Sequence, residues 1–270
     1  MRAIPLYLAV GVALRPPFPP GAQSSASAKA VSDSTAAASA AVDPKAVAAL
    51  EKMGTYLRTL KQFSVHGDST FDVVVDNGQK LQFPGTIDYR VRAPNALAID
   101  LKTDRKDRQL FYDGKQLTVY GAKTGYYATI DAPATTRELL AIIEDDYGIE
   151  LPLVDLFLWG TDKASTSALT WATFVGPTRI NGTATDHYAF RQEGVDWQVW
   201  IEQGSKPLPR RMVITTTDEP SQPQYTSTLT WNTNATFKDS NFTFVPPKDA
   251  KRIQLVKATL VEEIDQEGTP

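Results

Sequence analysis

Apolar residues recur every three or four positions in the first stretch of the chain that is rich in large side chains. Asp43 and Pro44 open this stretch with a residue that can cap free amides and a proline suited to the first helical turn. The apolar positions that follow form one stripe: Ala46, Val47, Leu50, Met53, Tyr56, Leu57 and Leu60. The pattern predicts an amphipathic helix that begins at Asp43 and ends near Gln62.

The period of the pattern changes from helical to alternating at Phe63. Phe71, Val73 and Val75 alternate with other residues until Asn77-Gly78 supplies a hairpin turn. After this turn a return strand is predicted that ends at residue 91. Similar runs predict the first strand at 63–75 and further strands at 97–101, 109–112, 116–120, 126–130, 171–180, 183–191, 195–201, 210–217 and 224–232. Short turns between neighbouring runs favour one large antiparallel sheet, and a sheet of this many strands curls.

The alternation breaks between residues 132 and 160. Thr135 and Glu138 have the spacing of a capping box, and leucines and isoleucines follow. We predict two short helices here, at about 135–145 and 151–158. Together with the first helix they are available to cover the apolar face of the curled sheet, either as a filled core or as a lid over a lipophilic cavity. Tyr120, Tyr126 and Tyr127 are expected on the strands just before this lid.

The two ends of the chain have compositions unlike that of the middle. A short apolar run from Ala3 to Leu14, between Arg2 and Arg15, has the length of a secretory signal and is too short to span a bilayer. We predict a signal peptide at 1–22, an Ala/Ser-rich flexible linker at 23–42, a folded domain at 43–256 and an acidic disordered tail at 257–270. The expected location is therefore periplasmic or extracellular.

Composition and charge exclude several classes of function. The net charge of −3 provides no broad positive field for nucleic acid, so we expect no nucleic-acid partner. With no cysteine, the chain has no disulfide, thiolate nucleophile or Cys-ligated zinc. We also expect no cofactor, no transmembrane span and a monomeric protein.

A few titratable residues invite a catalytic or metal-binding interpretation. His66 and His187 each lie among polar residues of predicted strands, which is typical of hydrogen-bonded surface histidines. The run Glu144-Asp145-Asp146 offers oxygen ligands for a cation, but a helix end next to Tyr147-Gly148 favours a solvated loop. No nucleophile elbow or phosphate-binding glycine loop is present. We therefore predict no catalytic residues and no metal site, and a non-enzymatic role.

The order of these motifs resembles a known bacterial family. The resemblance rests on a helix, three long strands, the stretch LFYDGKQLTVY at 110–120, a Leu-rich helical insert and a second strand series ending in FTFVPP at 242–247. This chain resembles the predicted periplasmic protein family DUF2092, which is placed among LolA/LolB/LppX-like proteins. The resemblance implies a mainly β, α+β fold: an unclosed β-barrel with a helical lid that shelters acyl chains.

We predict a carrier that holds a lipid or another lipophilic molecule between the half-barrel and its lid. The expected ligand-lining residues on the strands are Tyr89, Val91, Leu97, Ile99, Val119, Trp197, Val199, Leu229 and Trp231, and those on the lid are Leu139, Leu140, Ile143 and Phe157. A second hypothesis is an envelope interaction domain with a filled core, which docks on a protein partner. A third, a lipid hydrolase, requires His66 or His187 to meet a serine or aspartate in the cavity.

Overall fold

The computed structural model describes residues 41–149, 151, 153 and 166–257. The predicted signal peptide, most of the predicted linker and all but one residue of the predicted tail lie outside these residues, as does most of the predicted second inserted helix. The helices are α1 (Pro44–Thr59) and α2 (Thr136–Tyr147), with single 3₁₀ turns at Thr166–Ala168 and Asp239–Asn241. The strands are β1 (Gln62–Val74), β2 (Lys80–Arg92), β3 (Ala96–Thr103), β4 (Asp107–Tyr112), β5 (Gln116–Gly121), β6 (Tyr126–Asp131), β7 (Trp171–Ile180), β8 (Thr183–Gln192), β9 (Val195–Glu202), β10 (Pro209–Thr216), β11 (Gln224–Asn232) and β12 (Lys251–Arg252).

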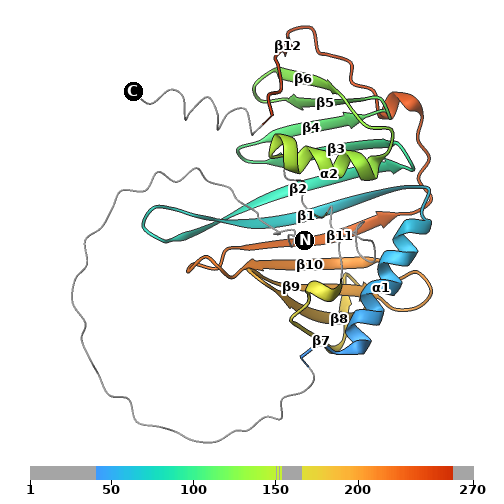
Figure 1. Cartoon of the computed structure of the whole chain (residues 1–270), viewed down its shortest axis with the longest axis vertical. Coiled ribbons are helices and arrows are strands. Elements are labelled where there is room, and N and C mark those ends of the chain that lie inside the picture. Colours follow the sequence, from blue (N-terminus) through green and yellow to red (C-terminus); the bar gives the residue numbers. More distant parts are fainter. Residues whose placement is uncertain (1–40, 150, 152, 154–165, 258–270) are drawn as a thin grey trace, which may run out of the picture.

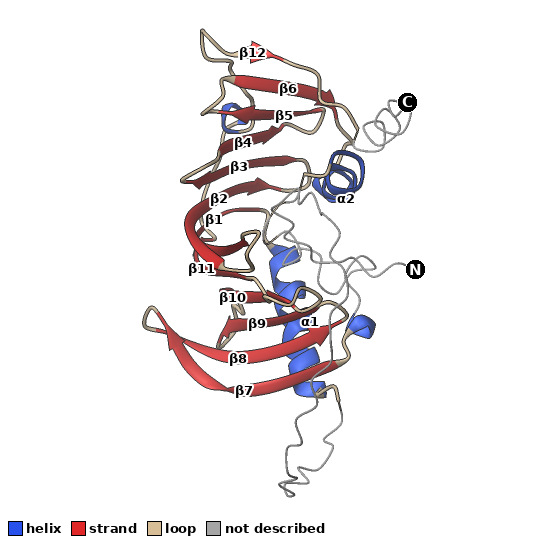
Figure 2. Cartoon of the chain, turned by 90° about the vertical axis from the view of Figure 1, so that its left-hand side faces the viewer, coloured by secondary structure: helices blue, strands red, loops and turns tan. Residues whose placement is uncertain are grey.

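The described strands form one sheet of 12, in the order β12-β6-β5-β4-β3-β2-β1-β11-β10-β9-β8-β7 (Figure 1). Every neighbouring pair is antiparallel except β12, which runs parallel to β6. The first and last strands in this order do not pair, so the barrel is not closed. Figure 2 shows the sheet curved, with α1 and α2 on its concave side. The predicted fold, an unclosed β half-barrel with helices over one face, is confirmed.

β1 joins two meanders of antiparallel strands into this sheet. It pairs with β2 on one side, where Val65 lies opposite Tyr89, and with β11 on the other, where Val65 lies opposite Trp231. Tight turns connect consecutive strands, as at Asn181 and Gly182, whose φ angles of 47° and 80° suit a type I′ hairpin. The strand positions follow the predicted runs closely because alternation and turn residues both specify them. The sequence pattern did not reveal β12.

α1 begins where the helical spacing of apolar residues and the capping residue predict. One Asp43 carboxylate oxygen accepts a hydrogen bond from the amide of Lys45 at 2.8 Å, and the other accepts from the amide of Phe174 on β7 at 3.3 Å. Ala41 and Val42 already pair with Ala172, so contact with β7 starts two residues before the predicted domain boundary. The helix ends at Thr59, earlier than predicted, because β1 already starts at Gln62.

A C-terminal strap, residues 233–250, crosses the outer face of the sheet from β11 to the far edge (orange to red in Figure 1). Phe242, only 1% exposed, packs with Ala96 and Ala98 of β3. Phe244 then contacts the rings of Phe111 on β4, Tyr120 on β5 and Tyr127 on β6, with ring centroids 5.5, 5.2 and 5.2 Å apart respectively. The two phenylalanines of the strap thus contact four strands, β3 to β6, on the way to β12, which lies beside β6.

The strap explains two of the three tyrosines that were expected beside the lid. Tyr120 and Tyr127 lie directly opposite each other on β5 and β6 and face outward, where Phe244 covers them. Tyr126 has the opposite orientation, since neighbours in a strand alternate between faces, and it is 43% exposed. Two of the three tyrosines therefore form the surface on which the strap packs.

Candidate ligand-binding face

The register of the central strands places the predicted lining residues on the concave face. Tyr89 of β2 lies opposite Ile99 of β3, and Val91 lies opposite Leu97. Because side chains two positions apart share a face, each pair extends the same apolar surface. Twelve of the 13 predicted residues belong to, or pack against, one hydrophobic cluster that also includes α1 and α2. Phe157 lies outside the described residues.

These twelve residues divide into two groups by burial. Eight are buried against their protein neighbours: Tyr89, Leu97, Ile99, Leu139, Ile143, Trp197, Val199 and Leu229. Four pack against the cluster but keep part of their surface exposed: Val91, Val119, Leu140 and Trp231. The partly exposed group is where a ligand can make contact without first displacing the protein's own side chains. The lining role itself stays a prediction.

α2 lies on the concave side of the sheet at the level of β2 and β3 (Figure 2), and its apolar side chains belong to the same hydrophobic cluster as the strands. The predicted capping box is present: Thr135 Oγ1 accepts from the amide of Glu138 at 3.2 Å and donates to its carboxylate at 2.8 Å. Leu139 and Ile143, one helical turn apart, are 0% and 1% exposed. The structure thus confirms that the first inserted helix turns an apolar stripe toward the sheet.

The connections of α2 to the rest of the protein are concentrated at its ends. At the N-terminal end, the Tyr112 hydroxyl donates to the carbonyl of Pro133 at 2.5 Å, and the amide of Thr136 donates to the carbonyl of Pro94 at 2.9 Å. Burial raises the pKa of Tyr112 to about 12, so it donates this bond at any physiological pH. At the other end, Asp146 pairs with Lys257 at 2.8 Å in an exposed position. Packing of apolar side chains supplies the rest.

A group of three hydroxyls interrupts the apolar concave face at its centre. Ser69 Oγ lies 2.9 Å from the Tyr225 hydroxyl and donates to Ser227 Oγ at 3.0 Å. Tyr225 and Ser227 are 5% and 0% exposed, and burial raises the pKa of Tyr225. Our sequence analysis did not single out these residues. The sequence feature that could have identified them is a polar residue at a position of β1 or β11 that faces the concave side.

Both histidines face outward, away from the helices. His66 Nδ1 lies 2.7 Å from Asp88, and its Nε2 lies 3.3 Å from Asp68; the hydrogen bond to Asp88 raises the pKa of His66. His187 stacks on Trp200, with ring centroids 4.0 Å apart, and burial lowers its pKa. The hydrolase hypothesis requires a histidine to meet a serine or an aspartate in the cavity; in the described part of the chain the two aspartates that His66 contacts lie on the outer face with it.

The acidic run at 144–146, considered above as a possible metal site, contributes to an ion pair. Asp146 of the run at 144–146 forms the ion pair with Lys257. Within the described residues, no three His, Asp or Glu side chains are grouped closely enough to hold a metal ion. None of the helices described is long and apolar enough to cross a membrane.

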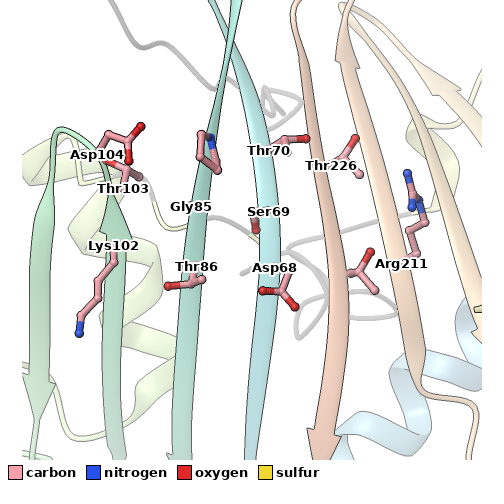
Figure 3. Close-up of a pocket in the computed structure, with 12 residues that line it drawn as sticks. Asp68, Ser69, Thr70, Gly85, Thr86, Lys102, Thr103, Asp104, Arg211 and Thr226 are labelled. Carbon is pink, nitrogen blue, oxygen red and sulfur yellow. The ribbon is translucent and has the colours of Figure 1, made fainter. Parts of the chain in front are cut away.

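A polar groove lies on the outer face of the sheet, opposite the helices (Figure 3). It has a volume of about 620 Å³ and crosses β10, β11, β1, β2 and β3. The lining residues are Asp68, Ser69, Thr70, Pro84, Gly85, Thr86, Lys102, Thr103, Asp104, Arg211, Thr226 and Thr228. Such a lining does not suit an acyl chain, so the groove is separate from the predicted lipid site.

Comparison with known proteins identifies the family of the chain. A search of curated proteins finds no match. Similar solved structures include the lipoprotein LppX of Mycobacterium tuberculosis, with 15% identity, a TM-score of 0.45 and coverage of 72% of this chain and 98% of that one. LprF of Mycobacterium bovis has 14% identity, a TM-score of 0.42 and coverage of 78% and 100%. An uncharacterized conserved protein of Thermus thermophilus has 10% identity, a TM-score of 0.43 and coverage of 78% and 99%. The family of predicted periplasmic proteins DUF2092 matches residues 46–256, and the chain belongs to this family.

Proposed function

We propose that this protein binds a lipid or another lipophilic molecule between the concave face of its sheet and α2, as a non-catalytic carrier in the periplasm. The observation that carries the proposal is the apolar concave face itself. Its strands turn a largely apolar surface, interrupted at the centre by the three hydroxyls, toward two amphipathic helices, and α2 packs on its part of that surface through side chains. The family description supports the location.

The partly exposed residues indicate how a ligand is accommodated. Val91 and Val119 on the strands and Leu140 on α2 each keep apolar surface that the protein does not bury. An acyl chain that covers this surface gains about 0.8 kcal/mol for each sheltered methylene. Several methylenes are needed to exceed the cost of association, so the proposal favours chains over small apolar molecules.

The test is native mass spectrometry of the protein purified from its own cells, combined with organic extraction and lipid identification. The proposal predicts a near-stoichiometric co-purifying lipid, or uptake of a fluorescent fatty acid by the extracted protein. A ligand-free mass and no uptake would contradict the proposal and would favour the alternative, an envelope interaction domain with a filled core.

Substitutions on opposite faces of β5 locate the binding. Val119→Glu places a charge on the concave face, whereas Gln116→Glu places the same side chain on the exposed outer face of the same strand. We expect Val119→Glu to weaken fatty-acid uptake at least tenfold and Gln116→Glu to leave it unchanged. Equal uptake by both variants would show that the ligand does not lie on the concave face.

A further inference from the structure

The outer groove is built on one row of directly opposed residues across the middle of the sheet. The pairs Lys102–Thr86, Thr86–Asp68, Asp68–Thr228 and Thr228–Arg211 are consecutive cross-strand partners. Four strand spacings separate Lys102 from Arg211, which corresponds to about 19 Å. The groove is therefore long enough for an extended chain of several units, and it has a cation at each end (Figure 3).

Neither of the two cations, Lys102 and Arg211, has a carboxylate within ion-pair distance among the described residues. Other basic residues of the outer face do: Arg90 pairs with Asp100 at 2.6 Å, and Arg191 pairs with Asp196 at 2.6 Å. Lys102 and Arg211 are thus available to an anionic group of a ligand.

Arg211 is also held in position by aromatic neighbours. Its guanidinium carbon lies 5.6 Å from the centroid of the Trp200 ring, and the His187 ring stacks on the same indole with an interplanar angle of 7°. His187 is fixed in turn by a 3.0 Å hydrogen bond with Gln198. This stack limits the freedom of Arg211 at the end of the groove, which lowers the entropic cost of a contact there.

The groove also offers hydroxyl groups and two carboxylates, Asp68 in the middle of the row and Asp104 at the end near Lys102 (Figure 3). Thr86 and Thr228 flank Asp68 in the row, and Thr70 and Thr226 form a second opposed pair beside it. The backbone groups of these central strands are engaged with neighbours on both sides, so the groove does not offer the free strand edge that an extended peptide uses. The central Asp68 opposes a uniform polyanion and suits a donor such as a sugar hydroxyl.

We propose that this groove binds an extended oligosaccharide that carries carboxylate groups. Sugar hydroxyls donate to Asp68 and exchange hydrogen bonds with the threonines, while carboxylates of the chain accept from Arg211 and Lys102 at the two ends. The site is independent of the lipid site, because the sheet lies between them.

Isothermal titration calorimetry of the full chain with a galacturonic acid hexamer tests this assignment. Maltohexaose serves as the neutral comparison and inorganic polyphosphate as the sugar-free polyanion. We expect the uronic acid hexamer to bind, and to bind at least tenfold more tightly than either comparison. No binding of the hexamer, or equal binding of polyphosphate or maltohexaose, would overturn the proposal.

Matched variants assign the binding to the groove. Arg211→Gln and Lys102→Gln are each expected to weaken hexamer binding about tenfold, and Thr228→Val, which keeps the shape but removes a hydroxyl, by a smaller factor. Lys115→Gln is the control, since this exposed lysine lies in the turn between β4 and β5 at the other end of the strands. Circular dichroism and fatty-acid uptake confirm that each variant is folded. Hexamer binding that is unchanged in both cation variants would contradict the assignment.

Discussion

α1 and α2 lie on the same concave face and show the same amphipathic pattern, yet they are attached to the sheet very differently. α1 buries Ala46, Leu50, Met53, Gly54 and Leu57. Its N-cap residue is hydrogen-bonded into β7, and Lys45 Nζ lies 3.5 Å from the centroid of the Phe174 ring. α2 is shorter; among the described residues it buries Leu139 and Ile143 fully and has a hydrogen bond beside its first turn and an ion pair in its last.

The difference assigns the two helices different roles. An element with many buried contacts and with backbone bonds to a strand opens only when the protein unfolds, whereas one with few such contacts opens locally at a lower free energy. α1 is therefore part of the permanent core, and α2 has the properties expected of a lid. Periodicity alone does not distinguish them, since both helices have apolar residues at the same spacing.

Shortening a buried side chain of α1 should cause the largest loss of stability. Leu50 is 0% exposed, and Leu50→Ala is expected to lower the free energy of unfolding by about 2–5 kcal/mol. Urea denaturation measures this loss, with the exposed Glu51→Ala as the control. A loss below about 1 kcal/mol would show that α1 is not an integral part of the core.

Hydrogen exchange compares the two helices without any substitution. We expect amides in the middle of α2 to exchange at least tenfold faster than those in the middle of α1, a difference of about 1.4 kcal/mol in opening free energy. Mass spectrometry of peptides from residues 44–59 and 136–147 provides the measurement. Equal protection would mean that the helices open together, and α2 would then not be a lid.

Removal of one anchor of α2 should have a smaller effect. Tyr112→Phe deletes the hydroxyl that donates to Pro133 and keeps the ring, so we expect a loss of about 1 kcal/mol in the free energy of unfolding. Exchange at the first turn of α2 should accelerate, while exchange in α1 stays the same. If α1 accelerates equally, the hydrogen bond stabilises the whole core and does not specifically anchor the lid.

A substitution on the outer face should have the smallest effect on the two helices. It therefore serves as a control for the substitutions in α1 and beside α2. The hydrogen bond to Asp88 raises the pKa of His66 in the folded protein. This contribution to stability is therefore present below the unfolded pKa of about 6.5 and is lost as the pH rises through the folded pKa. Asp88→Asn should lower the pKa of His66 in an NMR titration and leave exchange in α1 and α2 unchanged. An unchanged His66 pKa would contradict the role of Asp88.

β1 to β11, the first two helices and the inward register were predictable because each has a local signal in the sequence. Alternation places Tyr89 and Leu229 on the concave face, and Asn181-Gly182 specifies its own turn. The strap was not predictable in this way. Phe242 and Phe244 stand among prolines and polar residues with no periodicity, and their positions depend on contacts with strands more than a hundred residues earlier.

The concave face and the outer groove also differ in how far they could be predicted from the sequence. The concave face could be predicted because the long strands carry apolar residues at alternate positions, as β2 and β9 do. The outer groove depends on which polar residues become neighbours across five strands. Lys102 and Arg211 are far apart in the sequence, and the register of four strand pairs from β3 to β10 places them in one row.

Photo-crosslinking of a bound lipid tests the central claim most directly. Protein freed of lipid by extraction is incubated with a fatty acid that carries a diazirine in its chain, irradiated and mapped by peptide mass spectrometry. The account predicts adducts on α2 and on concave-face positions of β2 to β5, near Leu140, Val91 and Val119. Adducts confined to the outer face, or none under conditions of demonstrated uptake, would contradict a lipid site between the sheet and α2.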